Sequence, residues 1–245
     1  MAVRQQPEQQ APPVQRLRIR YAKRGRLRFT SHRDFSRAFE RAVMRARVPV
    51  AYSSGFNPHP RISYAGAAPT GAASEAEYLE IALQEKIEPA AAHAALSEAM
   101  PDGLDLLDVV DTAEVGGAAL ADLLQASSWV IDLPSPAEQT ESAVATFLTA
   151  DEVLVERMTK KGMREFDARG AVVSLSALPR QGGSRLELVL RHGTPAVRPD
   201  DVVTGLRNVG GLRTGPEYGG VPLLTRLSQG PFDEVNGTIG DPLNP

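Results

Sequence analysis

The sequence contains no cysteine. This absence excludes a disulfide framework, a thiolate zinc site, a cysteine nucleophile and a cysteine-ligated iron–sulfur cluster. The four histidines are scattered singly and show no metal-ligand spacing, so we expect neither a metal nor another cofactor. With 245 residues, the chain can bury a sizeable core without covalent or metal cross-links.

Long apolar runs are missing as well. No stretch approaches the roughly 18–20 apolar residues of a membrane-spanning helix, and the first residues, MAVRQQPEQQAPPVQ, contain no apolar signal region. We therefore expect a soluble, cytoplasmic protein with no membrane partner. Lysine is also scarce, with 4 lysines against 23 arginines, so the basic character of the chain comes almost entirely from arginine.

Positive charge is concentrated in one part of the chain. Residues 16–64 hold 13 Lys and Arg residues against two acidic ones, whereas the remainder holds 14 against 28. The segment therefore carries +11 in a protein whose net charge is −3. Such asymmetry is typical of a surface that binds a polyanion, above all nucleic acid. The alternative is a solvated basic face that acidic neighbours in the fold balance.

The periodicity of apolar residues predicts two similar units between two tails. Residues 1–15, rich in Gln and Pro, are expected to be disordered, and residues 229–245 to form a flexible tail. The first unit, 16–111, is expected to contain strands on both sides of a KRGR turn (17–21 and 27–29), at 61–66, 77–83 and 104–111, and helices at 31–47 and 88–100. After a linker at 112–127, the second unit, 128–228, is expected to contain strands at 129–133, 153–157, 171–177, 185–190 and 221–227, and helices at 136–149 and 199–208. This order predicts an α+β fold of two tandem ferredoxin-like (βαββαβ) units, the second with an extra strand or hairpin.

The helix predicted at 31–47 has two distinct faces. Ser31 can cap its N-terminus, with Asp34 completing a pattern similar to a capping box. One face is apolar, while arginines recur every four residues along another, at positions 33, 37, 41 and 45. Like charges at this spacing repel by a few tenths of a kcal/mol per pair. Phosphate binding would explain the pattern, since each neutralised phosphate releases counterions; alternatively, carboxylates from strands or loops neutralise the arginines.

The segment that follows, VPVAYSSGFNPHPR, combines aromatic rings with a stiff backbone. Pro58 and Pro60 favour extended geometry in the residues before them, which predicts a loop. Aromatic rings beside arginine are typical of single-stranded RNA recognition, in which bases stack and phosphates pair. The alternative is that Tyr52 and Phe56 anchor the loop in the core.

These patterns predict an RNA- or phosphate-binding surface. Its basic residues are Arg26, Arg28, His32, Arg33, Arg37, Arg41, Arg45 and Arg61, and its loop or stacking residues are Tyr52, Ser53, Gly55, Phe56, Asn57 and His59. His32 and His59 are also candidates for acid–base catalysis, although a histidine at a helix N-terminus more often forms hydrogen bonds or contacts phosphate.

The stretch GRLRFTSHRDFSRAFERAVMRARVPVAYSSGFNPHPRISYAGAAPTG, with EYLEI after it, resembles the signature of a bacterial family of unknown function associated with radical-SAM proteins. The matching positions are Arg28, Ser31, His32, Asp34, Arg37, Arg41, Pro49, Ser53, Gly55, Phe56, Asn57, Pro58 and Gly71. Members of that family occur as a C-terminal extension of a radical-SAM protein or as a separate protein encoded beside one. The resemblance therefore implies a radical-SAM partner. Separate members tend to be encoded near ribonuclease E/G and large-subunit ribosomal proteins, which implies that RNA is a binding partner.

Three functions remain compatible with these observations. The first is an accessory protein that binds ribosomal or transfer RNA for modification or processing; without cysteine, the chain cannot itself be the radical-SAM enzyme. The second is a metal-independent endoribonuclease, by analogy with the tandem ferredoxin-like enzymes that process CRISPR transcripts. The third is a protein–protein module that docks on a radical-SAM partner without RNA.

Overall fold

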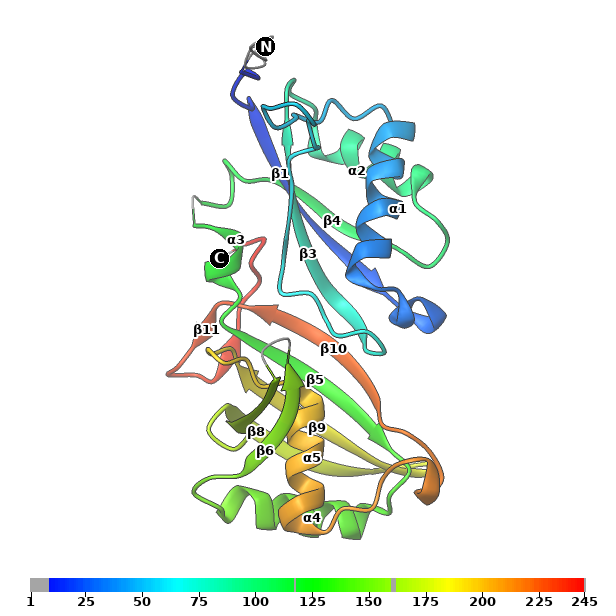
Figure 1. Cartoon of the computed structure of the whole chain (residues 1–245), viewed down its shortest axis with the longest axis vertical. Helices are drawn as coiled ribbons and strands as arrows, with labels where there is room; N and C mark the ends of the chain where they lie inside the picture. The colour runs from blue at the N-terminus through cyan, green and yellow to red at the C-terminus, as the bar shows by residue number, and fades with distance from the viewer. Residues whose placement is uncertain (1–8, 117, 160–161, 245) are drawn as a thin grey trace, which may run out of the picture. The chain divides into compact units, whose positions relative to one another are not determined.

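The computed structural model describes residues 9–116, 118–159 and 162–244. The chain divides into two compact units (Figure 1), the first comprising Met1–Asp122 with Leu243–Pro245 and the second Leu123–Pro242. The division falls inside the linker predicted at 112–127. No helix within the described ranges is long and apolar enough to cross a membrane.

Unit 1 contains one antiparallel sheet and two long helices. Its elements are β1 (Gln15–Lys23), the 3-10 turn η1 (Gly25–Phe29), α1 (His32–Arg45), β2 (Ile62–Ala65), β3 (Ala73–Leu83), α2 (Pro89–Ala99) and β4 (Leu106–Asp111). The strands lie side by side in the order β4-β1-β3-β2. A short helix, α3 (Leu120–Leu123), follows at the boundary between the units.

The core of unit 1 joins the sheet to both helices. Alternation along β1 turns Leu17 and Ile19 to the same face of the sheet, and these residues pair with Ile81 and Leu79 of β3. The ring of Tyr21 stacks on that of Phe35 in α1, with 4.0 Å between the ring centroids. Other buried members of this cluster are Phe39, Val43, Val48, Val50, Leu83, Ala92, Leu96, Leu104 and Leu106. The apolar face predicted for the helix at 31–47 therefore packs against the sheet.

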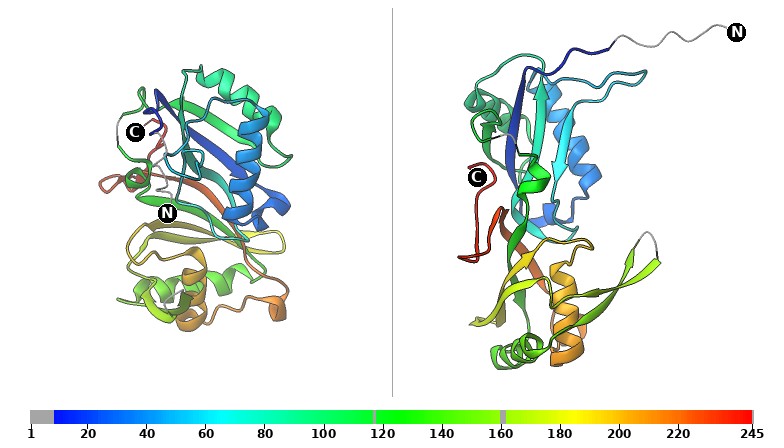
Figure 2. Two further views of the ribbon diagram at one scale, coloured as in Figure 1. Left: turned by 45° about the horizontal axis from the view of Figure 1, so that its top comes forward. Right: turned by 90° about the vertical axis from the view of Figure 1, so that its left-hand side faces the viewer.

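Unit 2 has a second antiparallel sheet and additional short strands. Its elements are β5 (Ala126–Leu133), α4 (Ala137–Thr149), β6 (Leu154–Thr159), β7 (Gly162–Asp167), β8 (Val172–Arg180), β9 (Gly183–Arg191), α5 (Pro199–Gly210), the 3-10 turn η2 (Pro216–Tyr218), β10 (Leu223–Gly230), β11 (Phe232–Asp233) and β12 (Thr238–Ile239). The sheet has the order β10-β5-β9-β8. Strands β6 and β7 form a separate hairpin that projects from the rest of this unit (Figure 2).

The α+β class is confirmed, and the tandem ferredoxin-like arrangement stays a prediction. One expected strand is wrong: residues 27–29 belong to the turn η1, and the apolar–basic alternation there does not continue β1. Gly25 takes a left-handed φ of 53°, which ends the extended chain, and Leu27 then packs against the core. Gly103 takes a left-handed φ of 84°, which favours glycine, and a Cβ there would lie 2.8 Å from Leu27 Cδ1, so the Leu27 side chain would have to shift.

The structure contradicts the tail expected at 229–245, whereas the one expected at 1–15 stays a prediction. In the segment 1–15, residues 1–8 lie outside the described residues, and β1 already begins at Gln15. The segment 229–245 contains the end of β10 and the paired strands β11 and β12. Backbone and side-chain hydrogen bonds tie it to Gln125, which neighbours β5, so this segment has defined partners.

Candidate functional site

Helix α1 begins as its sequence predicts. The Ser31 hydroxyl oxygen accepts a hydrogen bond from the backbone N–H of Asp34 at 3.2 Å, and the same hydroxyl donates to the Asp34 carboxylate at 2.7 Å. Ser31 is thus the N-cap, and Asp34 lies near the positive end of the helix dipole. The helix ends at Arg45, after which Arg47 adopts a left-handed φ of 54° and Val48 N–H donates to the Val43 carbonyl.

The arginines of β1 and those of α1 have different surroundings. Arg18 pairs with Glu80 at 2.8 Å, Arg20 with Asp108 at 2.5 Å, and Arg24 with both Glu75 and Asp105. Leu17 and Ile19 pack in the core with α1, so Arg18 and Arg20, which alternate with them along β1, lie with their acidic partners on the opposite face of the sheet.

The arginines of α1 that we call the arginine stripe are Arg33, Arg37 and Arg41. All three side chains are exposed. Across the described ranges, no carboxylate forms an ion pair with any of them. Arg45, the fourth arginine in the predicted series, instead donates to the backbone carbonyl of Ala99 at the end of α2. Three positive charges on one helix therefore have no ion-pair partner among the described residues, while the fourth links two helices.

A groove runs beside the C-terminal half of α1. It has a volume of about 710 Å³ and is lined by Arg37, Glu40, Arg41, Val43, Met44, Arg45, Tyr52 and Pro60. The Met44 side chain is 65% exposed, and the Tyr52 hydroxyl lies 3.5 Å from its sulfur. The groove therefore brings part of the predicted arginine series together with Tyr52 from the predicted loop.

The loop itself is closed by local hydrogen bonds. Tyr52 and Pro60 form an isolated bridge, Ser53 N–H donates to the His59 carbonyl at 2.9 Å, and His59 N–H donates to the Ser53 hydroxyl at 3.0 Å. Gly55 takes a φ of 125°, a conformation that favours glycine in the turn. Tyr52 is partly buried against the core, whereas Phe56 is 61% exposed at the tip, where Asn57 is exposed too.

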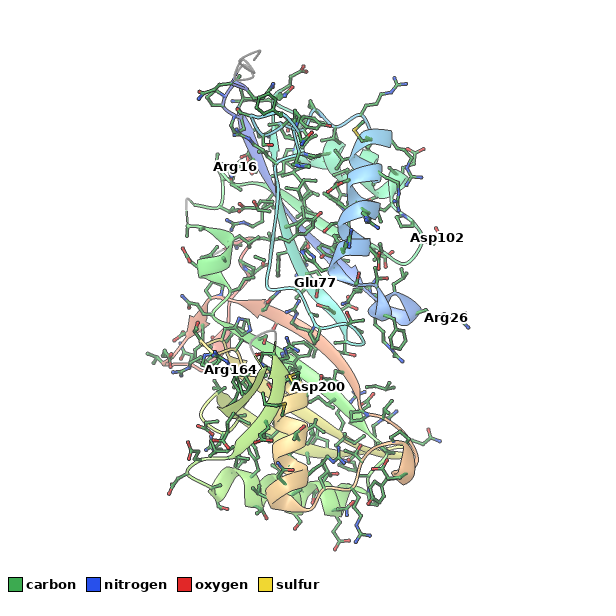
Figure 3. The ribbon with its side chains drawn as sticks, in the orientation of Figure 1. Arg16, Arg26, Glu77, Asp102, Arg164 and Asp200 are labelled. Atoms are coloured by element: carbon green, nitrogen blue, oxygen red, sulfur yellow. The ribbon has the colours of Figure 1, made fainter. Side chains whose placement is uncertain are left out.

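The remaining predicted basic residues lie outside the groove. Arg26 projects from η1 into solvent (Figure 3), and the guanidinium of Arg28 lies over the ring of Phe29, 4.8 Å from its centroid. Arg61 is partly buried, and its backbone pairs with Ala51 and Ala82. These residues can extend a basic surface, but none of them lines the groove.

His32 lies at the first position of α1 beside a partly buried tyrosine. Its ring meets that of Tyr64 edge to face, with 4.8 Å between the centroids. The Tyr64 hydroxyl is buried and has no hydrogen-bond partner among the described residues. Burial raises the pKa of Tyr64 to about 12; the nearby Ser36 hydroxyl opposes the shift without meeting hydrogen-bond geometry, and the Glu40 carboxylate adds to it. Tyr64 thus stays protonated and supports the His32 ring by packing.

Sequence reasoning missed several residues of this region. Met44 lies off the apolar face of the helix, and that position could have marked it as an exposed contact. Glu40 lies among the arginines of α1, yet no arginine among the described residues forms an ion pair with it. Nothing in the sequence around Tyr64 distinguished it from an ordinary strand residue. No three His, Asp or Glu side chains in the described part of the chain are grouped so as to hold a metal ion.

Comparisons with known proteins give a family match and several structural likenesses. Residues 16–199 match the model of a family described as "Uncharacterized protein conserved in bacteria (DUF2344)". No curated protein matches the chain. A structure described as "Crystal Structure of a Cbf5-Nop10-Gar1 Complex" is similar to it with 12% identity and a TM-score of 0.43, over 93% of this chain and 56% of the other. The chain thus spans about half the length of that one, and a likeness this weak carries no functional argument.

Proposed function

We propose that this protein, which belongs to the bacterial DUF2344 family, binds RNA through the arginine stripe of α1 and the loop that follows it. The observation that carries the proposal is the contrast between paired arginines on β1 and unpaired ones on α1. Arg33, Arg37 and Arg41 repeat every four residues, so that each repels the next, and no carboxylate among the described residues forms an ion pair with any of them. RNA phosphates would neutralise all three and release counterions.

The ferredoxin-like assignment and the radical-SAM partner belong to the same proposal. The strand orders β4-β1-β3-β2 and β10-β5-β9-β8, each with two helices between strands, support a ferredoxin-like unit in both halves. The resemblance of residues 16–83 to proteins associated with radical-SAM enzymes supports an accessory role. Because the chain has no cysteine, the partner would have to supply the cluster.

Charge reversal on α1 tests RNA binding directly. In Arg33→Glu/Arg37→Glu/Arg41→Glu, we expect the affinity for a fluorescein-labelled 20-nucleotide RNA to fall on the order of 100-fold, and the salt slope of log Kd to decrease by about 2. Arg45 is left unchanged because its guanidinium donates a hydrogen bond to the Ala99 carbonyl. The measurement is fluorescence anisotropy across a salt series.

The matched control places the same charge change on unit 2. Arg164, Arg207 and Arg213 are exposed there, and their reversal to Glu should leave the affinity within a factor of about 3 if phosphates bind α1 alone. Equal losses from both triple variants would reduce the effect to net charge and contradict the proposal. Binding unaffected by reversal of the stripe, with a radical-SAM protein retained after nuclease treatment, would instead favour the protein-docking module. Cleavage of the RNA in EDTA, lost in His32→Ala, would favour the endoribonuclease.

A further inference from the structure

The groove beside α1 combines an apolar floor with charged walls. Met44, Tyr52 and Pro60 supply apolar surface, and Arg37, Glu40 and Arg41 supply charge from successive turns of the helix. Its volume of about 710 Å³ falls within the range of pockets that bind small organic groups. A planar group that is apolar on its faces and polar at its edges would match both parts of this lining.

The exposed methionine is the first indication of an occupant. Met44 is 65% exposed although its neighbours Ala42 and Val43 are buried. Its sulfur lies 3.5 Å from the Tyr52 hydroxyl, so the thioether and the tyrosine ring border one surface. Methionine adapts to ligands of varied shape and makes favourable contacts with aromatic rings, and tyrosine offers a stacking face. A nucleobase is the planar aromatic ring that an RNA ligand would bring.

Glu40 is the second indication. Arg37 precedes it by three residues and Arg41 follows it directly, yet no described arginine forms an ion pair with it. A carboxylate is only an acceptor of hydrogen bonds, so it repels phosphate and selects groups that present N–H donors. Guanine presents two adjacent donors on its Watson–Crick edge, one on N1 and one on the exocyclic amine, which match the two carboxylate oxygens. Uracil presents one N–H between two carbonyl oxygens that a carboxylate repels.

We propose, on the premise that the protein binds RNA as argued above, that this groove holds one unpaired guanine of a single-stranded RNA segment. The base lies against Met44 and Tyr52, Glu40 accepts hydrogen bonds from its Watson–Crick edge, and Arg37 and Arg41 pair with the adjoining phosphates. The arginine stripe supplies affinity for any RNA, and Glu40 supplies the selection among bases. An acidic peptide would match the arginines equally well, but it would leave Glu40 facing like charge.

The test uses four labelled 11-nucleotide RNAs, each of uridines with G, A, C or U at the centre. We expect wild-type protein to bind the G-centred RNA about 10-fold more tightly than the all-U RNA, the discrimination typical of one bidentate base contact. Glu40→Gln should lose most of this preference. It should also bind the all-U RNA at least as tightly as wild type, because a negative charge beside the phosphates is removed; this gain identifies a folded variant.

A second variant tests the stacking surface. Tyr52→Leu keeps an apolar side chain but removes the ring, and should weaken binding of the G-centred RNA about 10-fold, with a smaller effect on the all-U RNA. Met44→Ala, at an exposed position, should weaken it a few-fold. Equal affinity of wild type for all four RNAs, with binding still lost on reversal of the arginine stripe, overturns the guanine site and leaves RNA binding intact. Failure of every RNA to bind overturns both.

Discussion

The first helix of each unit follows the first strand of its sheet and buries an apolar face, but the outward faces of α1 and α4 differ. α1 carries four arginines, whereas α4, AEQTESAVATFLT, has no basic residue and carries Glu138 and Glu141. In both helices, residues such as Phe35 and Phe147 supply the packing. A helix at this position in the element order therefore does not need arginine to bury its apolar face.

The two units also differ in an ion pair between the first and third strands of each sheet. Arg18 of β1 lies opposite Glu80 of β3, and the Arg18 side chain is only 1% exposed. Asp132 of β5 lies opposite Arg185 of β9, and the Arg185 side chain is 43% exposed. The Arg185 guanidinium holds the pKa of the Asp132 carboxyl below its ordinary value. The two units therefore have similar topology, but one contains a buried ion pair and the other a solvated one. We expect the two pairs to contribute differently to the free energy of unfolding.

The largest effect is expected from breaking the buried pair. Glu80→Ala leaves the Arg18 guanidinium buried without its carboxylate, and should lower the free energy of unfolding of unit 1 by about 3–5 kcal/mol. Arg185→Ala, which breaks the exposed pair, should lower that of unit 2 by less than about 1 kcal/mol. Hydrogen exchange with mass spectrometry separates the two, since it reads the amides of β1 and β3 apart from those of β5 and β9. Equal losses in the two variants would contradict the comparison.

A moderate effect on stability is expected when the pH is lowered, and it concerns unit 2. His192 Nδ1 lies 2.7 Å from the Leu124 carbonyl oxygen and Nε2 lies 2.8 Å from the Ser127 hydroxyl, to which the Trp129 indole N–H also donates. The neutral ring can donate through Nδ1 and accept through Nε2. Burial lowers the pKa of His192 below its ordinary 6.5. As the pH falls, the unfolded chain therefore takes up a proton on His192 at a higher pH than the folded chain does. The stability that the neutral ring contributes is present above pH 6.5 and decreases as the pH falls.

The measurement uses Trp129, the only tryptophan of the chain, which reports on unit 2. Urea unfolding followed by its fluorescence at about pH 8 and about pH 5.5 should show a loss of stability on the order of 1 kcal/mol larger in wild type than in His192→Gln. Burial also raises the pKa of Asp200, which acts in the opposite direction at lower pH, so the comparison with the variant isolates the histidine. An identical pH dependence in the two proteins would rule out this role.

The smallest effect concerns the arginine stripe itself. Arg37→Gln removes two repulsive contacts, with Arg33 and with Arg41, and should stabilise unit 1 by a few tenths of a kcal/mol while weakening RNA binding. Glu141→Gln on α4 is the matched change in unit 2 and should alter neither property measurably. Thermal unfolding and anisotropy together check the prediction. Destabilisation by Arg37→Gln would mean that the arginine stripe is structural after all.

Part of this architecture could be read from short-range patterns. The capped, two-faced helix at 31–47 was predicted because its cap, its apolar period and its arginines lie within one segment. An extra strand or hairpin was expected in the second unit, but residues 162–167 were not assigned to a strand, since GMREFD lacks alternation and pairs only through its hairpin with β6. The turn η1 was mistaken for a strand because apolar–basic alternation fits both conformations, whereas the left-handed φ of Gly25 ends the extended chain before it.

The sequence by itself determined where the positive charge lies, how α1 is capped and which of its faces is apolar, because these depend on residues within a few turns. Only the tertiary structure decided which arginines are neutralised. Arg20 and Asp108 are 88 positions apart, and the register of β1 with β4 brings them together. The same long-range packing leaves Arg37 and Arg41 without a carboxylate partner among the described residues and places Tyr52 beside Met44. The local sequence pattern therefore predicts where the basic segment lies. The register of the strands decides which of its arginines form ion pairs and which have no carboxylate partner among the described residues.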